Sequence, residues 1–98
     1  MTTTLTIRPA TTADTSGLVD LARLDSARPL AGDVLVAEAA GRPVAAMALD
    51  SGRAVADPFL PTAAAVAVLR VRAEQLRAGR RAESLLTARR LLLRTASG

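Results

Sequence analysis

Alternating apolar and polar side chains mark the first segment of the chain. In residues 4–8, Leu5 and Ile7 face one way and the polar residues between them face the other. This two-residue period predicts a half-buried β-strand. A Thr-x-x-Asp sequence at residues 11–14 then resembles a capping box. It begins a predicted helix that runs to about residue 27, with apolar side chains at helical spacing. Because Asp25 falls on the apolar arc of this helix, either the helix ends before it or its carboxylate caps another group.

Two apolar segments with β-branched residues come next. Residues 33–40 and residues 42–49 are separated by Gly41, which allows a tight reversal. The pattern predicts a β-hairpin. A second turn leads to residues 53–56, which we expect to pair back on the hairpin as a third strand.

The longest predicted helix follows a Pro-bracketed turn. Pro61 suits its first helical position, because proline has no N–H to leave unpaired there. Residues 63–69 are apolar all round, which predicts burial on more than one side. Gly79 is placed to stop the helix. Four residues share the face expected to pack on the sheet: Val66, Leu69, Ala73 and Leu76.

A final helix is predicted over residues 82–94. Leu85, Ala88 and Leu92 share one arc, with two more leucines beside them, and Arg89 interrupts that arc. The order of elements is therefore β-α-β-β-β-α with a basic C-terminal helix, which is an α+β fold with a small, mainly antiparallel sheet. We expect one domain over residues 1–79 and a basic amphipathic helix and tail over residues 80–98.

Charge is distributed unevenly along the 98 residues. Residues 1–60 carry five Arg and seven acidic residues, a net charge of −2, whereas residues 61–98 carry eight Arg and two Glu, a net charge of +6. The basic end predicts an anionic surface or an acidic protein as partner, or simply a solvated helix over a sheet edge. Nucleic acid is disfavoured because no aromatic residue near this end can stack on bases. The arginines concerned are Arg80, Arg81, Arg89, Arg90 and Arg94.

Several residue types are missing from the sequence. Without cysteine the chain forms no disulfide, and without histidine it has no imidazole for a metal, so no metal site is predicted. There is no run of about 18 apolar residues, so no transmembrane segment is predicted. The first residues also lack the pattern of a signal peptide. Together these features predict a cytoplasmic protein.

Three charged side chains are candidates for chemistry. Glu38 on the predicted hairpin could act as a general base through a water molecule, although strand carboxylates are more often solvated or paired. Asp57 could orient a substrate amine, but an Asp-Pro pair more often starts a turn. Arg8 is expected to be a solvated residue on an edge strand. No catalytic residue is assigned.

Some of these segments resemble the GNAT superfamily of N-acetyltransferases. The opening Ile-Arg-Pro-Ala-Thr at residues 7–11, followed by an aspartate and two leucines, is similar to the common start of that family. Residues 35–38 and residues 41–45 resemble its Val-Ala-Glu hairpin, and residues 55–58 resemble the strand that precedes its cofactor loop. The resemblance extends over about residues 5–77 and implies the N-terminal half of the GNAT fold.

The resemblance implies acetyl-CoA as cofactor. The strand Ala54, Val55 and Ala56 would then supply backbone hydrogen bonds to the pantetheine arm, and backbone N–H groups at Thr62, Ala63 and Ala64 would hold the pyrophosphate at a helix start. In the family this turn is rich in glycine and basic residues. Here residues 59–64 contain neither Gly nor Arg, and the chain has no Tyr to serve as a general acid. The resemblance therefore implies a truncated, degenerate member.

Two functions follow from these patterns. One is acetyl-CoA-dependent transfer of an acetyl group to an amine, with catalytic activity left open. The alternative is a non-catalytic interaction or scaffold module that forms a homodimer, or binds a partner or an anionic surface, through its apolar helices and Arg-rich tail. A homodimer is expected because a short sheet and an Ala-rich helix leave apolar surface exposed.

Overall fold

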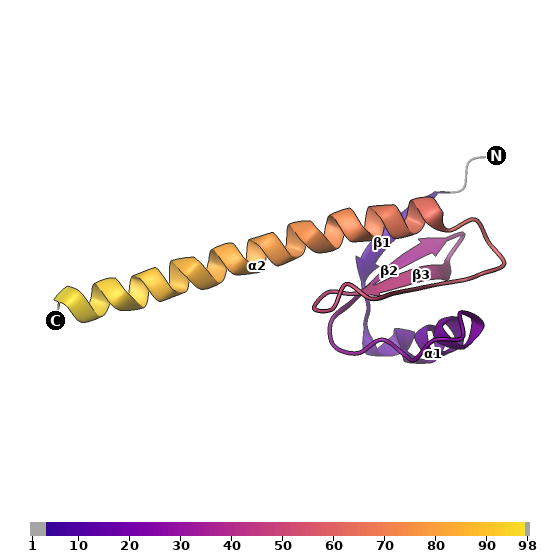
Figure 1. Cartoon of the computed structure of the whole chain (residues 1–98), viewed down its shortest axis with the longest axis horizontal. Helices are drawn as coiled ribbons and strands as arrows, with labels where there is room; N and C mark the ends of the chain where they lie inside the picture. Colours follow the sequence, from indigo (N-terminus) through magenta and orange to yellow (C-terminus); the bar gives the residue numbers. More distant parts are fainter. Residues whose placement is uncertain (1–3, 98) are drawn as a thin grey trace.

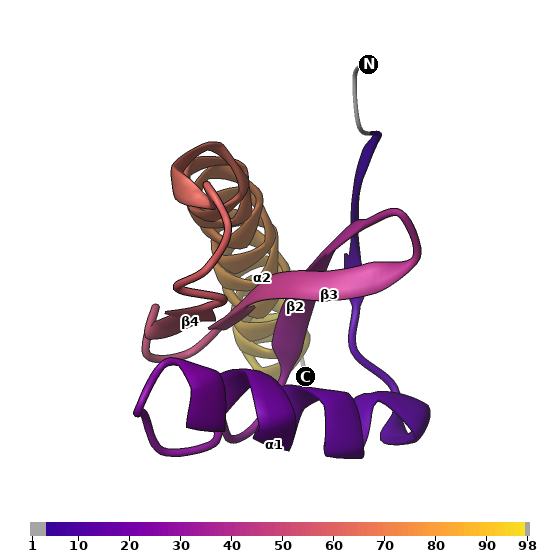
Figure 2. The ribbon, with the colours of Figure 1, turned by 90° about the vertical axis from the view of Figure 1, so that its right-hand side faces the viewer.

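A four-stranded antiparallel sheet organises the structure, a computed structural model that describes residues 4–97. Its strands lie in chain order: β1 (Leu5–Pro9), β2 (Val34–Ala39), β3 (Arg42–Ala48) and β4 (Ala54–Ala56). Helix α1 (Thr15–Leu24), preceded by a 3-10 turn (Thr12–Asp14), packs against β3 and β4. Helix α2 (Ala63–Ser97) crosses the other face of the sheet against β2 and β3 (Figures 1 and 2). The predicted α+β class is confirmed, and so is the order β-α-β-β-β-α up to the long helix.

Both faces of the central strands are buried, and this explains their continuous apolar sequences. Leu35 and Met47 point towards α2 and join Leu69 in one core layer. Val34 and Val55 point towards α1 and join Leu21 in the other. The alternation of side chains along each strand thus divides one small core into two layers on opposite sides of the sheet.

The hairpin turn has the predicted position. Ala40 and Gly41 both have positive φ, 53° and 76°, which is the backbone of a two-residue type I′ turn between β2 and β3. Gly41 suits this conformation because it has no Cβ. The reversal predicted at these residues is therefore confirmed.

The first helix ends earlier than predicted. The α-helix stops at Leu24 because Ser26 adopts a left-handed conformation with φ of 51°. The N–H of Ala27 donates to the carbonyl of Ala22 (2.8 Å), and the N–H of Ser26 donates to the carbonyl of Arg23 (3.0 Å). These two bonds form a Schellman motif, which usually contains glycine at the left-handed position. Because the residue is serine and not glycine, the sequence did not indicate the motif.

Helix α2 differs most from the prediction. It runs unbroken through Gly79 for 35 residues, so the predicted stop and the separate helix at residues 82–94 are wrong. The boundary expected between residues 79 and 80 falls inside one helix. Its start is also shifted, because α2 begins at Ala63 rather than at Pro61. A glycine inside a helix costs about 1 kcal/mol relative to alanine, which good helix formers on both sides can offset.

Over residues 63–94, α2 is buried on one side. Leu69 and Ala73 are fully buried and Val66 and Leu76 pack beside them, as predicted for the sheet-facing side. Val68, on another side of the same segment, is exposed, so the predicted burial on more than one side is wrong. From residue 78 to residue 94 every side chain is exposed, and this half of α2 extends past the sheet (Figure 1).

Candidate functional site

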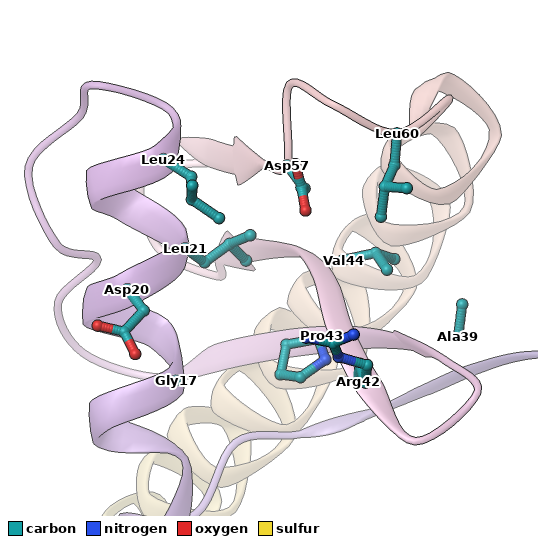
Figure 3. Close-up of a pocket in the computed structure, with 10 residues that line it drawn as sticks. All are labelled: Gly17, Asp20, Leu21, Leu24, Ala39, Arg42, Pro43, Val44, Asp57 and Leu60. Carbon is teal, nitrogen blue, oxygen red and sulfur yellow. The ribbon is translucent and has the colours of Figure 1, made fainter.

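An open hollow lies where β4 leads into α2. It has a volume of about 540 Å³ and lies between α1, the start of β3 and the loop after β4 (Figure 3). Leu21 and Leu24 of α1 face Val44 and Leu60 across it. A second hollow of about 300 Å³ shares three of its residues and reaches the first turn of α2. The turn that the sequence singled out therefore borders both of these hollows.

Polar groups at the larger hollow come from Asp20, Arg42 and Asp57. The Asp57 carboxylate points into the hollow in Figure 3, but its Oδ1 accepts a hydrogen bond from the backbone N–H of Phe59 (2.9 Å). This bond is the Asx turn that an aspartate commonly makes two residues along its own backbone. Asp57 therefore has the turn-forming role that its position before Pro58 indicates.

The residues predicted to hold acetyl-CoA do not form one site. Thr62 and Ala64 line the smaller hollow, and Thr62 accepts the first helical bond of α2, from the N–H of Val66 (2.9 Å). Ala63 is the first residue of α2. The three residues of β4, by contrast, line neither hollow within residues 4–97.

One backbone group of β4 already has a partner. Arg53 and Asp57, which flank β4, form backbone hydrogen bonds with β3. Because such bonds alternate along an antiparallel strand, the backbone groups of Ala54 and Ala56 point away from β3. The N–H of Ala56 donates to Oδ2 of Asp25 (3.1 Å). Asp25 follows the last residue of α1, so the helix ends before it. The carboxylate of Asp25 also caps an exposed strand edge, so both alternatives left open by the sequence hold.

A charged cluster joins β1, β2 and the start of the first helix. Arg8 makes a bidentate pair with Asp14 (2.7 and 2.8 Å), and its Nε donates to Oε1 of Glu38 (2.6 Å). The side chains of Asp14 and Glu38 are only 11% and 19% exposed. Arg8 lies on an edge strand, as predicted, but it is not merely solvated, because it neutralises two largely buried carboxylates. Glu38 binds this guanidinium and does not line either hollow.

Hydrogen bonds from Arg8 and from the backbone of Thr11 hold the pKa of Asp14 well below its usual range. The same pairing, first with Asp14 and then with Glu38, raises the pKa of Arg8. The Thr11 N–H bond to Asp14 (2.6 Å) completes the capping arrangement predicted at residues 11–14. The cluster fastens the first helix to the sheet, so its role is structural.

Acid should weaken this cluster. Because folding lowers the pKa of Asp14, its contribution to stability is complete above the unfolded value near 4 and is lost as the pH falls below it. We expect the urea midpoints of the unmodified chain and Asp14→Asn to differ at neutral pH, and the difference to shrink progressively as the pH falls below about 4. Asp20→Asn, at an exposed carboxylate outside the cluster, is the matched control. A difference that stays constant into acid would contradict the assignment.

The sequence did not reveal an exposed stripe along α2. Its positions recur alternately four and three residues apart, which keeps them on one side of a helix that packs along another helix. All of them are exposed, and Leu85 and Leu92 reach 71%. The stripe has nine residues, and seven of them are apolar. We call this set the α2 stripe: Ala64, Val68, Val71, Gln75, Ala78, Ala82, Leu85, Arg89 and Leu92.

One basic residue of α2 makes ion pairs with the domain. Arg80 pairs with Asp33 (2.8 Å) and lies 3.9 Å from Asp50, both in loops of the domain. This contact lies on the surface, close to the point at which α2 leaves the sheet. Of the arginines predicted to meet a partner, Arg80 therefore has a partner within the chain, and Arg89 lies in the α2 stripe.

Comparisons with protein-family models, with curated proteins and with solved structures found no match for this chain. Among residues 4–97, no group of three acidic side chains is placed to hold a metal ion. No helix in the same range is long and apolar enough to cross a membrane. The resemblance to the GNAT superfamily and the cytoplasmic location stay predictions.

Proposed function

We propose that this chain is a non-catalytic interaction module, and that its working surface is the α2 stripe, which packs against another helix. The observation that carries the proposal is the stripe itself: nine exposed positions in a heptad pattern along a single helix. A sustained heptad repeat of apolar residues is typical of helices that pair along their length.

The second half of α2 supports this proposal. Most of the stability of a protein helix comes from packing of its apolar face and not from the propensity of its residues. Beyond Arg80 the helix extends away from the sheet, and its side chains up to residue 94 are exposed (Figure 1). This segment carries five exposed leucines, among them Leu85 and Leu92. Apolar surface of this kind on a small domain usually marks a binding site.

A synthetic acidic peptide can test the stripe. The probe is a labelled helix of about four heptads, with Leu at each seam position and Glu beside the seam. We expect Leu85→Glu to weaken its binding at least about tenfold, because that change places a charge inside the apolar contact. The readout is fluorescence anisotropy with the full chain.

Leu91→Glu is the matched control for this measurement. It makes the same chemical change in the same helix, but Leu91 lies on another side of α2 and is outside the stripe. If both changes weakened peptide binding equally, binding would depend on charge alone and not on the stripe. Absence of binding to the unmodified chain would argue against a helix-binding surface.

A GNAT-type acetyltransferase is the second candidate. The observations in its favour are the order β-α-β-β-β-α, with helices on opposite faces of the sheet, and the hollow beside Thr62 at the start of α2. We propose that the domain is related to the N-terminal half of that fold. The Asp25 carboxylate on the N–H of Ala56 occupies one of the groups that would bind the pantetheine arm, which favours the interaction module.

Calorimetry with acetyl-CoA separates the two candidates. Micromolar binding that Thr62→Glu weakens would support a cofactor site at the start of α2, because the new charge would repel the pyrophosphate. Absence of binding at millimolar acetyl-CoA would argue against the enzyme. Desulfo-CoA controls for effects of the thiol.

A further inference from the structure

We infer that the helix bound by the α2 stripe is the α2 helix of a second copy of this chain, which runs antiparallel to the first and is centred on Ala78 and Ala82. This inference rests on the proposed function, since it names the partner of the same surface. Four features of the molecule support it: the order of side-chain sizes along the stripe, the placement of Arg89, the distribution of charge, and the position of the domain relative to the stripe.

Side-chain sizes along the stripe suit antiparallel self-pairing. The smallest residues, Ala78 and Ala82, lie at its middle, with valines towards one end and leucines towards the other. When Ala78 of one copy is level with Ala82 of the second, Val68 is level with Leu92. Small residues then meet at the centre, where the helices can approach closely, and large apolar residues meet at both ends.

The placement of Arg89 selects the direction of the second helix. In a parallel pair the two Arg89 side chains would meet across the seam and repel. In the antiparallel pair they lie 18 residues apart along the axis, about 27 Å at 1.5 Å per residue, which exceeds the screening length of about 10 Å. Arg89 then comes level with Val71 of the second copy, within one helical turn of Glu74. Its stem can cover the valine while the guanidinium reaches the carboxylate.

The distribution of charge favours the same direction. Residues 1–60 have a net charge of −2 and residues 61–98 a net charge of +6. An antiparallel pair places the basic half of each α2 beside the half that carries the acidic domain of the other copy. A parallel pair would instead place the two basic halves together.

The domain leaves room for this arrangement. Ala65, Leu69 and Ala73 face the sheet, whereas Val68 and Val71 of the stripe are exposed on another side of α2. A second helix can therefore lie along the stripe without displacing the sheet. The exposed second half of each α2 then lies against the first half of the other, which makes the contact a closed two-fold interface.

Cysteine cross-linking tests both the second copy and its direction, because the natural chain has no cysteine. We expect a mixture of Val68→Cys and Leu92→Cys chains to form a disulfide between the two variants on mild oxidation, since these positions are level in the antiparallel pair. Each variant alone should form at least about tenfold less cross-linked product. A mixture of Val68→Cys with Leu91→Cys, one residue outside the stripe, is the matched control, and circular dichroism confirms that each variant is folded.

The outcomes are distinct. Rapid cross-linking of Leu92→Cys to itself would overturn the antiparallel direction. Absence of cross-linking above the control, together with a monomeric mass by light scattering at micromolar concentration, would overturn the second copy as partner. A monomer that still binds the acidic peptide through Leu85 would leave the proposed function intact, whereas a monomer that binds no peptide would remove both.

Discussion

Leu69→Ala is expected to destabilise the protein by about 2–5 kcal/mol, because it removes a large, fully buried side chain and leaves a cavity. Leu69 has no exposed surface and joins Leu35 and Met47 in the core layer between α2 and the sheet. The free energy of unfolding of a small domain is only about 5–15 kcal/mol, so this one change should remove a large share of it. Urea unfolding, followed by far-UV circular dichroism at low protein concentration, measures the loss as a lower midpoint at unchanged slope.

Leu91→Ala is the control for this experiment. It removes the same atoms from the same helix at a position that is 58% exposed, and we expect a change within about 0.5 kcal/mol. If Leu69→Ala were equally mild, α2 would not be packed across the sheet, and the description of the core would be wrong.

The strands could be predicted because their sequences satisfy two requirements together. β2 and β3 are apolar on both faces, and Ala40-Gly41 between them suits a turn with positive φ. The face of α2 that packs on the sheet was also predictable, since Leu69 and Ala73 follow the helical period.

The charged cluster could not be found from spacing along the chain. Arg8 and Glu38 are 30 residues apart in sequence and come together only because β1 pairs with β2 in a register that places Thr6 opposite Glu38. A carboxylate alone in a strand pattern gives no sign of its partner across the sheet. The bond from Ala56 to Asp25 has the same origin, because it depends on where the first helix ends relative to β4.

The α2 stripe was missed for a different reason. The expected break at Gly79 divides the heptad pattern into two short pieces, neither of which is long enough to suggest a paired helix. Residues 63–69 were also expected to be buried on more than one side, so Ala64 and Val68 gave no sign of an exposed seam. Once α2 is continuous, the two pieces join in one register across Gly79. The candidate surface thus follows from the continuity of one helix.

Gly79→Pro is therefore expected to have the second large effect. Proline inside a helix costs about 3 kcal/mol or more, because it removes a backbone hydrogen bond and its ring clashes with the carbonyl four residues earlier, here that of Gln75. The domain should remain folded, since the buried residues of α2 within residues 63–94 all precede residue 79. The helical segment after residue 79 should no longer be continuous with the rest of α2 and should fray. Far-UV circular dichroism and hydrogen exchange over residues 80–97 would detect this loss of helix.

Gly79→Ala supplies the opposite test at the same position. Gly79 has no atom within 4 Å of an added Cβ, so alanine fits, and it should strengthen the helix by about 1 kcal/mol. A protein whose helix ended at Gly79 would instead tolerate proline and gain nothing from alanine. If the stripe works as one surface, Gly79→Pro should also abolish the cross-link between positions 68 and 92, because the two halves would no longer share a register, whereas Gly79→Ala should retain it.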